Sequence, residues 1–84
     1  MRLLLIEDDA KTANFLSRGL SEEGHVCDVL GSGQDGLFHA LREQYDVVIV
    51  DRMVPDLDGL SLVKALRSAG NRTPVLFLTA IGGI

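Results

Sequence analysis

The chain has 84 residues, of which 46% are hydrophobic and 24% charged, a balance typical of one small globular domain rather than a disordered segment. The net charge is −4 and the Lys and Arg residues form no cluster, so nothing indicates that these residues bind nucleic acid themselves. No apolar run approaches the roughly 18 residues of a membrane-spanning helix. The single cysteine, Cys27, cannot form an internal disulfide, and Leu3–Ile6 is too short for the core of a leader peptide. We therefore expect a cytoplasmic protein without membrane contact.

Short apolar runs alternate along the chain with stretches of helical periodicity. The runs predict strands at 3–6, 26–30, 46–51 and 74–79. The amphipathic stretches predict helices between Asp9 and Gly24, from Ser32 to about Tyr45, and between Asp58 and Gly70. This β-α-β-α-β-α-β alternation predicts an α/β fold, in which a parallel sheet carries helices on both faces.

The third predicted strand is the most informative part of the chain. Four consecutive β-branched residues, Val47 to Val50, indicate a strand that is buried on both faces. The strand ends in Asp51, and a loop containing Pro55 and Gly59 follows. Because open α/β sheets carry their chemistry at the carboxyl ends of the strands, we interpret Asp51 as the reactive group.

Other polar residues follow the neighbouring strands at the same edge of the sheet. Glu7 and Asp8 come after the first strand, and Thr79 ends the fourth. Carboxylates that are packed together repel one another unless a cation lies between them, and a few oxygen ligands completed by water suit Mg²⁺. Asp51 is then a plausible nucleophile toward phosphorus, and the Thr79 hydroxyl could donate a hydrogen bond to a phosphoryl oxygen.

Three ordered motifs resemble those of bacterial response-regulator receiver domains. They are Ile6-Glu7-Asp8-Asp9, the stretch from Asp51 to Gly59 with its Asp-x-Met-x-Pro-x-x-Asp-Gly pattern, and Leu78-Thr79-Ala80. The resemblance covers all 84 residues. It implies a flavodoxin-like, doubly wound sheet, and right-handed crossovers then give the strand order 2-1-3-4.

The resemblance also implies roles for individual residues. Asp51 would accept a phosphoryl group from the phosphohistidine of a sensor histidine kinase. Glu7, Asp8, Asp51 and the backbone carbonyl of Met53 would hold Mg²⁺. Thr79 would bind a phosphoryl oxygen and change rotamer as part of a switch. The short connections look most like receivers that control winged-helix DNA-binding domains, so DNA would be reached only through an output domain outside these residues.

The chain also departs from the family pattern. Receivers continue through a fourth helix, a fifth strand that ends in a Lys, and a fifth helix, and neither Lys11 nor Lys64 matches that position. We therefore expect residues 1–84 to form a partial receiver domain, truncated before those elements. Two consequences are expected: self-association through an exposed fourth strand and a bare sheet face, and poor modification by acyl-phosphate donors.

Two other functions are compatible with parts of the sequence. An aspartate-dependent phosphatase would also use Asp51 as a nucleophile, but such enzymes favour an acid two residues later, where this chain has Met53. Gly31-Ser32-Gly33-Gln34-Asp35-Gly36 is a Gly-x-Gly-x-x-Gly motif of the kind that binds dinucleotides. A turn, a helix cap and a tolerated helix glycine would explain the same residues, and a dinucleotide fold beginning at Val26 would leave the first strand without a role.

Overall fold

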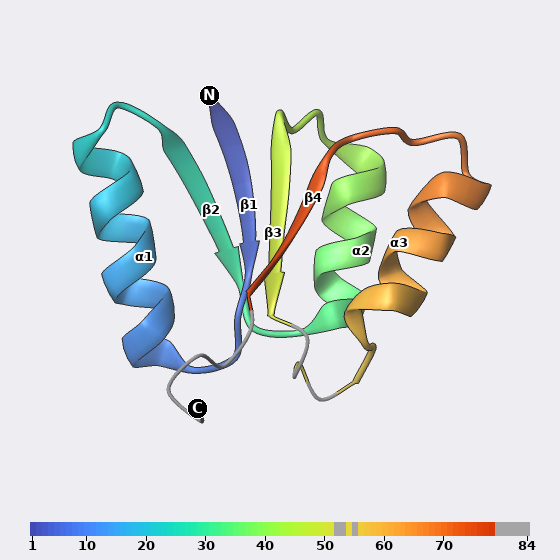
Figure 1. Cartoon of the computed structure of the whole chain (residues 1–84), viewed down its shortest axis with the longest axis horizontal. Helices are drawn as coiled ribbons and strands as arrows, with labels where there is room; N and C mark the ends of the chain where they lie inside the picture. Colours follow the sequence, from blue (N-terminus) through green and yellow to red (C-terminus); the bar gives the residue numbers. More distant parts are fainter. Residues whose placement is uncertain (52–53, 55, 79–84) are drawn as a thin grey trace.

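The computed structural model describes residues 1–51, 54 and 56–78. In chain order its elements are β1 (Arg2–Ile6), α1 (Ala10–Glu22), β2 (Val26–Leu30), α2 (Gly33–Arg42), β3 (Val47–Asp51), α3 (Gly59–Ser68) and β4 (Val75–Leu78). The strands are all parallel and lie in the order β2-β1-β3-β4 (Figure 1). Both the α/β class and the strand order are confirmed. No helix in the described part of the chain is long and apolar enough to cross a membrane.

Each helix begins at a side chain that the sequence marks as a cap. Asp9, Ser32 and Asp58 accept hydrogen bonds from backbone N–H groups three residues further on, at 3.0, 3.2 and 3.0 Å. These bonds satisfy N–H groups that have no partner within a helix. Gly24 and Gly70 follow α1 and α3 with φ of 90° and 81°, a backbone conformation that residues other than glycine rarely adopt. The predicted starts and ends of α1 and α3 are therefore correct.

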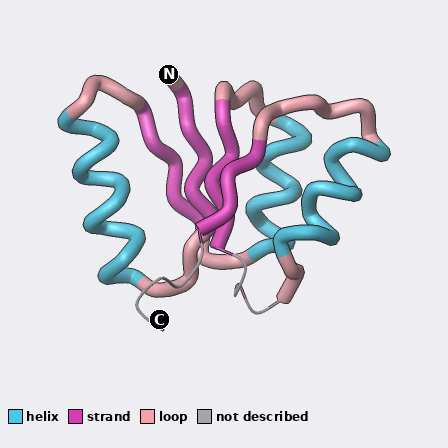
Figure 2. The backbone as a smooth tube through the Cα atoms, in the orientation of Figure 1, coloured by secondary structure: helices cyan, strands magenta, loops and turns pink. Residues whose placement is uncertain are grey.

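The two faces of the sheet are covered unequally. Helices α2 and α3 lie on one face and α1 alone lies on the other (Figure 2). On the α2–α3 face Val48 and Val50 are fully buried, whereas on the α1 face their neighbour Ile49 is only half-buried. In edge strand β4 Leu76 is 59% exposed. The prediction that the third strand is buried on both faces is therefore correct for only one of them.

Helix α2 ends earlier than the apolar pattern suggests. We expected it to reach about Tyr45, but the last helical residue is Arg42 and Glu43 is already extended. Turning the chain here buries the ring of Tyr45, which is 8% exposed, and lets its hydroxyl donate a 2.8 Å hydrogen bond to Asp28. Tertiary contacts of Tyr45 therefore decide where the helix stops.

Candidate metal and phosphoacceptor site

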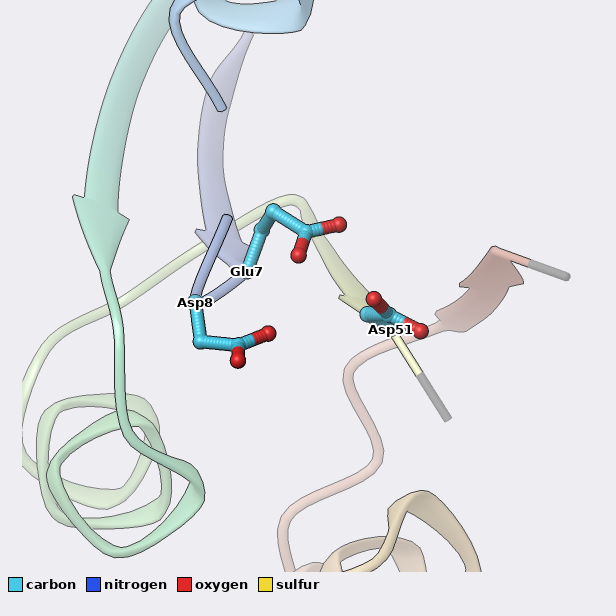
Figure 3. Close-up of side chains that lie close together, drawn as sticks. All are labelled: Glu7, Asp8 and Asp51. Carbon is cyan, nitrogen blue, oxygen red and sulfur yellow. The ribbon is translucent and has the colours of Figure 1, made fainter. Parts of the chain in front are cut away.

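Three acidic side chains converge where β1 and β3 end. The pairing of Ile6 with Val50 across the two strands places the residues that follow, Glu7 and Asp51, side by side. Asp8 extends from the same loop as Glu7. One carboxylate oxygen from each of the three lies within 4.8 Å of the others, and Figure 3 shows the three side chains around a common space. The expected convergence of Glu7, Asp8 and Asp51 is thus present in the fold.

The backbone after β1 holds Glu7 in place. Its side chain accepts a 3.0 Å hydrogen bond from the Asp9 N–H, and its own N–H donates to the Leu30 carbonyl at 2.9 Å. The carboxylate of Asp9 instead caps α1 by accepting a hydrogen bond from the Thr12 N–H. Two adjacent acids therefore have different tasks: Asp8 faces the cluster, and Asp9 starts the helix.

The electrostatics of the cluster disfavour three negative charges. Glu7 is only 5% exposed, and this burial raises the pKa of its carboxyl group above its ordinary value. The Asp9 N–H opposes the rise, whereas the nearby Asp51 and Asp8 carboxylates add to it. A divalent cation among the three oxygens would remove this repulsion, and Asp8 is exposed, so water could complete the coordination shell. The donor set fits a hard cation such as Mg²⁺.

Two predicted site residues, Met53 and Thr79, lie outside the described residues. Their expected roles as a carbonyl ligand and a phosphoryl-binding hydroxyl therefore stay predictions.

The glycines of the Gly-x-Gly-x-x-Gly motif serve packing. A Cβ atom on Gly33 would lie 2.7 Å from the Leu57 carbonyl oxygen, and one on Gly36 would overlap the Ile6 side chain. Gly36 is therefore required by the contact between α2 and β1, rather than merely tolerated in a helix. The N–H groups of Gly33 and Gln34, which would face a pyrophosphate in a dinucleotide site, donate instead to Asp56.

Asp56 is the residue near this edge that the sequence analysis missed. Its partners Ser32, Gly33 and Gln34 lie 22–24 residues earlier in the chain. No local motif links an acid in one loop to a helix start that far away. Only the folded arrangement brings them together.

Solved structures and protein sequences similar to this chain point to one class of protein. The receiver domain of Francisella response regulator 1452 superposes with a TM-score of 0.90 at 39% identity, over 95% of this chain and 66% of that one. The chain also superposes on the receiver domain of sensor histidine kinase PA1611 from Pseudomonas aeruginosa PAO1, with a TM-score of 0.88 at 29% identity, over 96% of this chain and 68% of that one. That structure has a magnesium ion coordinated in its active site cleft. The fold is that of a receiver.

Sequence comparison gives the family itself. The profile of the response regulator receiver domain matches residues 3–83, and the chain belongs to this family. It is 48% identical to the probable transcriptional regulatory protein SilR of Salmonella typhimurium over 84 residues, which are 100% of this chain and 37% of that protein. It is 44% identical to the transcriptional regulatory protein CusR of Escherichia coli (strain K12), again over 100% of this chain and 37% of that protein. The chain thus spans a little over a third of the length of these relatives, and its predicted likeness to receivers of transcriptional regulators is confirmed.

Proposed function

We propose that residues 1–84 are part of a receiver domain that accepts a phosphoryl group on Asp51 from a sensor histidine kinase. The observation that carries the proposal is the meeting of Glu7, Asp8 and Asp51 at one sheet edge, in a chain that belongs to the receiver family. In the transfer, an oxygen of the Asp51 carboxylate bonds to phosphorus as the bond from phosphorus to the kinase histidine nitrogen breaks. The products are an acyl phosphate on Asp51 and a free imidazole.

The residues around Asp51 have defined tasks in this proposal. Glu7, Asp8, Asp51 and the carbonyl of Met53 would hold Mg²⁺, and Thr79 would donate a hydrogen bond to a phosphoryl oxygen and change rotamer. When bound, Mg²⁺ would neutralise charge on the transferred phosphoryl group. Strand β3 fixes the Asp51 backbone by pairing with β1 on one side and β4 on the other.

The proposed chemistry is a single transfer rather than turnover of an external substrate. Receiver domains are not conventional enzymes, and Met53 stands where an aspartate-dependent phosphatase favours a second acid. Without an acid–base group at that position, the acyl phosphate should persist long enough to act as a signal. We propose that the signal passes to a DNA-binding output domain, as the names of the similar transcriptional regulators suggest, and that the protein works in the cytoplasm.

Phosphorylation of the 84 residues tests this function directly. The protein is incubated with Mg²⁺ and either a phosphorylated sensor kinase or acetyl phosphate, and the modified residue is located by mass spectrometry. We expect slow, Mg²⁺-dependent addition of one phosphoryl group at Asp51, none in Asp51→Asn, and normal addition in the control Asp46→Asn. Beryllofluoride with Mg²⁺ should shift the amide NMR signals around Asp51 in the parent protein and in Asp46→Asn, but not in Asp51→Asn. Equal modification of Asp51→Asn would contradict the proposal, and repeated release of phosphate would favour the phosphatase.

We also propose that β4 and the sheet face beside it support self-association. β4 is an edge strand, and its Leu76 is 59% exposed. Unpaired strand edges and apolar surface favour contact with another copy. Leu76→Lys should shift sedimentation toward monomer, whereas Val26→Lys, which changes a residue 61% exposed on the opposite edge strand, should not. A parent protein that is wholly monomeric at tens of micromolar would contradict this proposal.

A further inference from the structure

We propose that Asp56 is a positioning residue for the metal and phosphoacceptor site, because it clamps the loop after Asp51 onto the start of α2. The inference rests on the proposed function, since it assigns Asp56 a task in Mg²⁺ binding at Glu7, Asp8 and Asp51.

Asp56 uses both carboxylate oxygens in this clamp. One oxygen accepts from the Gly33 N–H at 2.7 Å, and the other accepts from the Ser32 hydroxyl at 2.7 Å and the Gln34 N–H at 3.1 Å. A carboxylate at a helix start also interacts favourably with the helix dipole. These bonds, the one from the Ser32 hydroxyl above all, hold the pKa of Asp56 below its ordinary value. Asp56 is therefore ionised and fully engaged at neutral pH.

The backbone beside Asp56 packs directly on the same helix turn. Gly33 is buried, and a Cβ atom there would lie 2.7 Å from the Leu57 carbonyl oxygen and 2.8 Å from the Leu57 Cβ. Only glycine, which has no Cβ atom, can pack this closely against Leu57. The hydrogen bonds and the packing thus hold Asp56 and Leu57 against the start of α2, the helix labelled in Figure 1.

The clamp connects both segments that carry the acidic cluster. Val54, which lies between Asp51 and Asp56 in the chain, is buried, and its N–H approaches the Asp51 carbonyl at 3.4 Å. One turn further along α2, Gly36 packs against the side chain of Ile6, the residue before Glu7. Helix α2 therefore joins the loop after β3 to the end of β1.

Loss of the clamp should weaken Mg²⁺ binding, although Asp56 is not itself a ligand. Groups that orient metal ligands typically change affinity by about 10-fold or more when they are removed. We expect Asp56→Ala to raise the Mg²⁺ dissociation constant, measured by calorimetry, by about tenfold. Ser32→Ala should have a smaller effect. The double variant should bind only slightly more weakly than Asp56→Ala alone, because the Ser32–Asp56 hydrogen bond is already lost there and only the Ser32 cap on the Asp35 N–H remains to be removed.

Two control variants separate the clamp from other effects. Asp35→Ala removes an exposed acid from the first turn of the same helix and reports the effect of charge alone. Tyr45→Phe removes a 2.8 Å hydrogen bond at the opposite edge of the sheet and reports the effect of lower stability alone. Both should keep the parent Mg²⁺ affinity. In Asp56→Ala the Gly33 and Gln34 amides should exchange with solvent faster in the absence of metal, and in Tyr45→Phe they should not.

The outcomes distinguish this inference from the function on which it rests. A parent protein that does not bind Mg²⁺ would overturn both. A parent that binds Mg²⁺ while Asp56→Ala binds equally well would overturn the positioning role alone. An equal loss in Asp35→Ala or Tyr45→Phe would overturn it too, since charge or stability would then explain the effect. A loss confined to the Asp56 and Ser32 variants, with faster exchange at Gly33, supports it.

Discussion

Acidic residues lie both at the amino-terminal edge of the sheet, where the parallel strands begin, and at the carboxyl-terminal edge, where they end. The two groups of acids have different surroundings. At the amino-terminal edge, Arg2 pairs with Asp28 at 3.1 Å and Glu43 at 3.2 Å, and its guanidinium lies 4.6 Å from the centre of the Tyr45 ring. The Arg2 N–H also donates to Asp46 at 2.7 Å. The acids at that edge are therefore compensated by hydrogen-bond and ion-pair partners within the chain.

The carboxyl-terminal edge instead holds Glu7, Asp8 and Asp51 within reach of one ion. The pKa of Glu7 is raised here, chiefly by burial, whereas the pKa of Asp28 at the other edge is lowered, chiefly by the Tyr45 hydroxyl. The two shifts have different causes: hydrogen bonds within the chain favour the charged form of Asp28, whereas burial and the neighbouring carboxylates disfavour the charged form of Glu7.

The largest expected effect is the loss of a proposed metal ligand. Asp8→Asn should raise the Mg²⁺ dissociation constant by about a hundredfold, which corresponds to roughly 3 kcal/mol. Its control is Asp46→Asn, which changes an acid at the compensated edge. Calorimetric titration of the two variants should show a large difference, and equal affinities would mean that Asp8 does not bind the ion.

At the compensated edge, the side chain to change is Tyr45. Tyr45→Phe removes a hydrogen bond to a charged acceptor and should lower the free energy of unfolding by about 1.5 kcal/mol. The loss should be the same with and without Mg²⁺, as measured by urea denaturation. A loss that disappears when Mg²⁺ is added would show that the two edges are coupled.

At the acidic edge, a substitution is expected to raise stability slightly rather than lower it. The raised pKa of Glu7 means that its contribution to stability is full below the unfolded pKa and is lost as pH rises through the folded one. Ionisation of Glu7 therefore destabilises the folded protein when no metal is bound. Glu7→Gln should raise the melting temperature of the metal-free protein and weaken Mg²⁺ binding. If Glu7→Gln melted at a lower temperature than the parent protein without metal, the charge of Glu7 would not be unfavourable in the folded state.

The last prediction concerns alkaline pH. Burial and the hydrogen bond to Asp28 raise the pKa of Tyr45 to about 12, and the chain has a single tyrosine, so tyrosinate absorbance reports this group alone. The stabilising contribution of Tyr45 is complete below its unfolded pKa of about 10 and is lost as pH rises toward 12. A midpoint near 10 in the folded protein would indicate that the hydroxyl is not held by Asp28.

The amino-acid sequence by itself determined the elements and most of their ends. Apolar runs specify strands because each face of the parallel sheet packs against at least one helix. Asp9, Ser32 and Asp58 specify helix starts because each satisfies a nearby backbone N–H. The positions of Glu7 and Asp51 at strand ends were likewise local facts. Parallel strands then require the two to share an edge.

Only the tertiary structure decided contacts between residues far apart in sequence. The bonds from Asp56 to the start of α2, the burial of Tyr45 against Asp28, and the fit of Gly36 against Ile6 have no local pattern. A carboxylate or a glycine looks the same in sequence whether its partner is 3 residues away or more than 20, because hydrogen bonding and close packing depend on distance in space. For this reason the acidic edge could be predicted, whereas the clamp beside it and the compensated edge opposite could not.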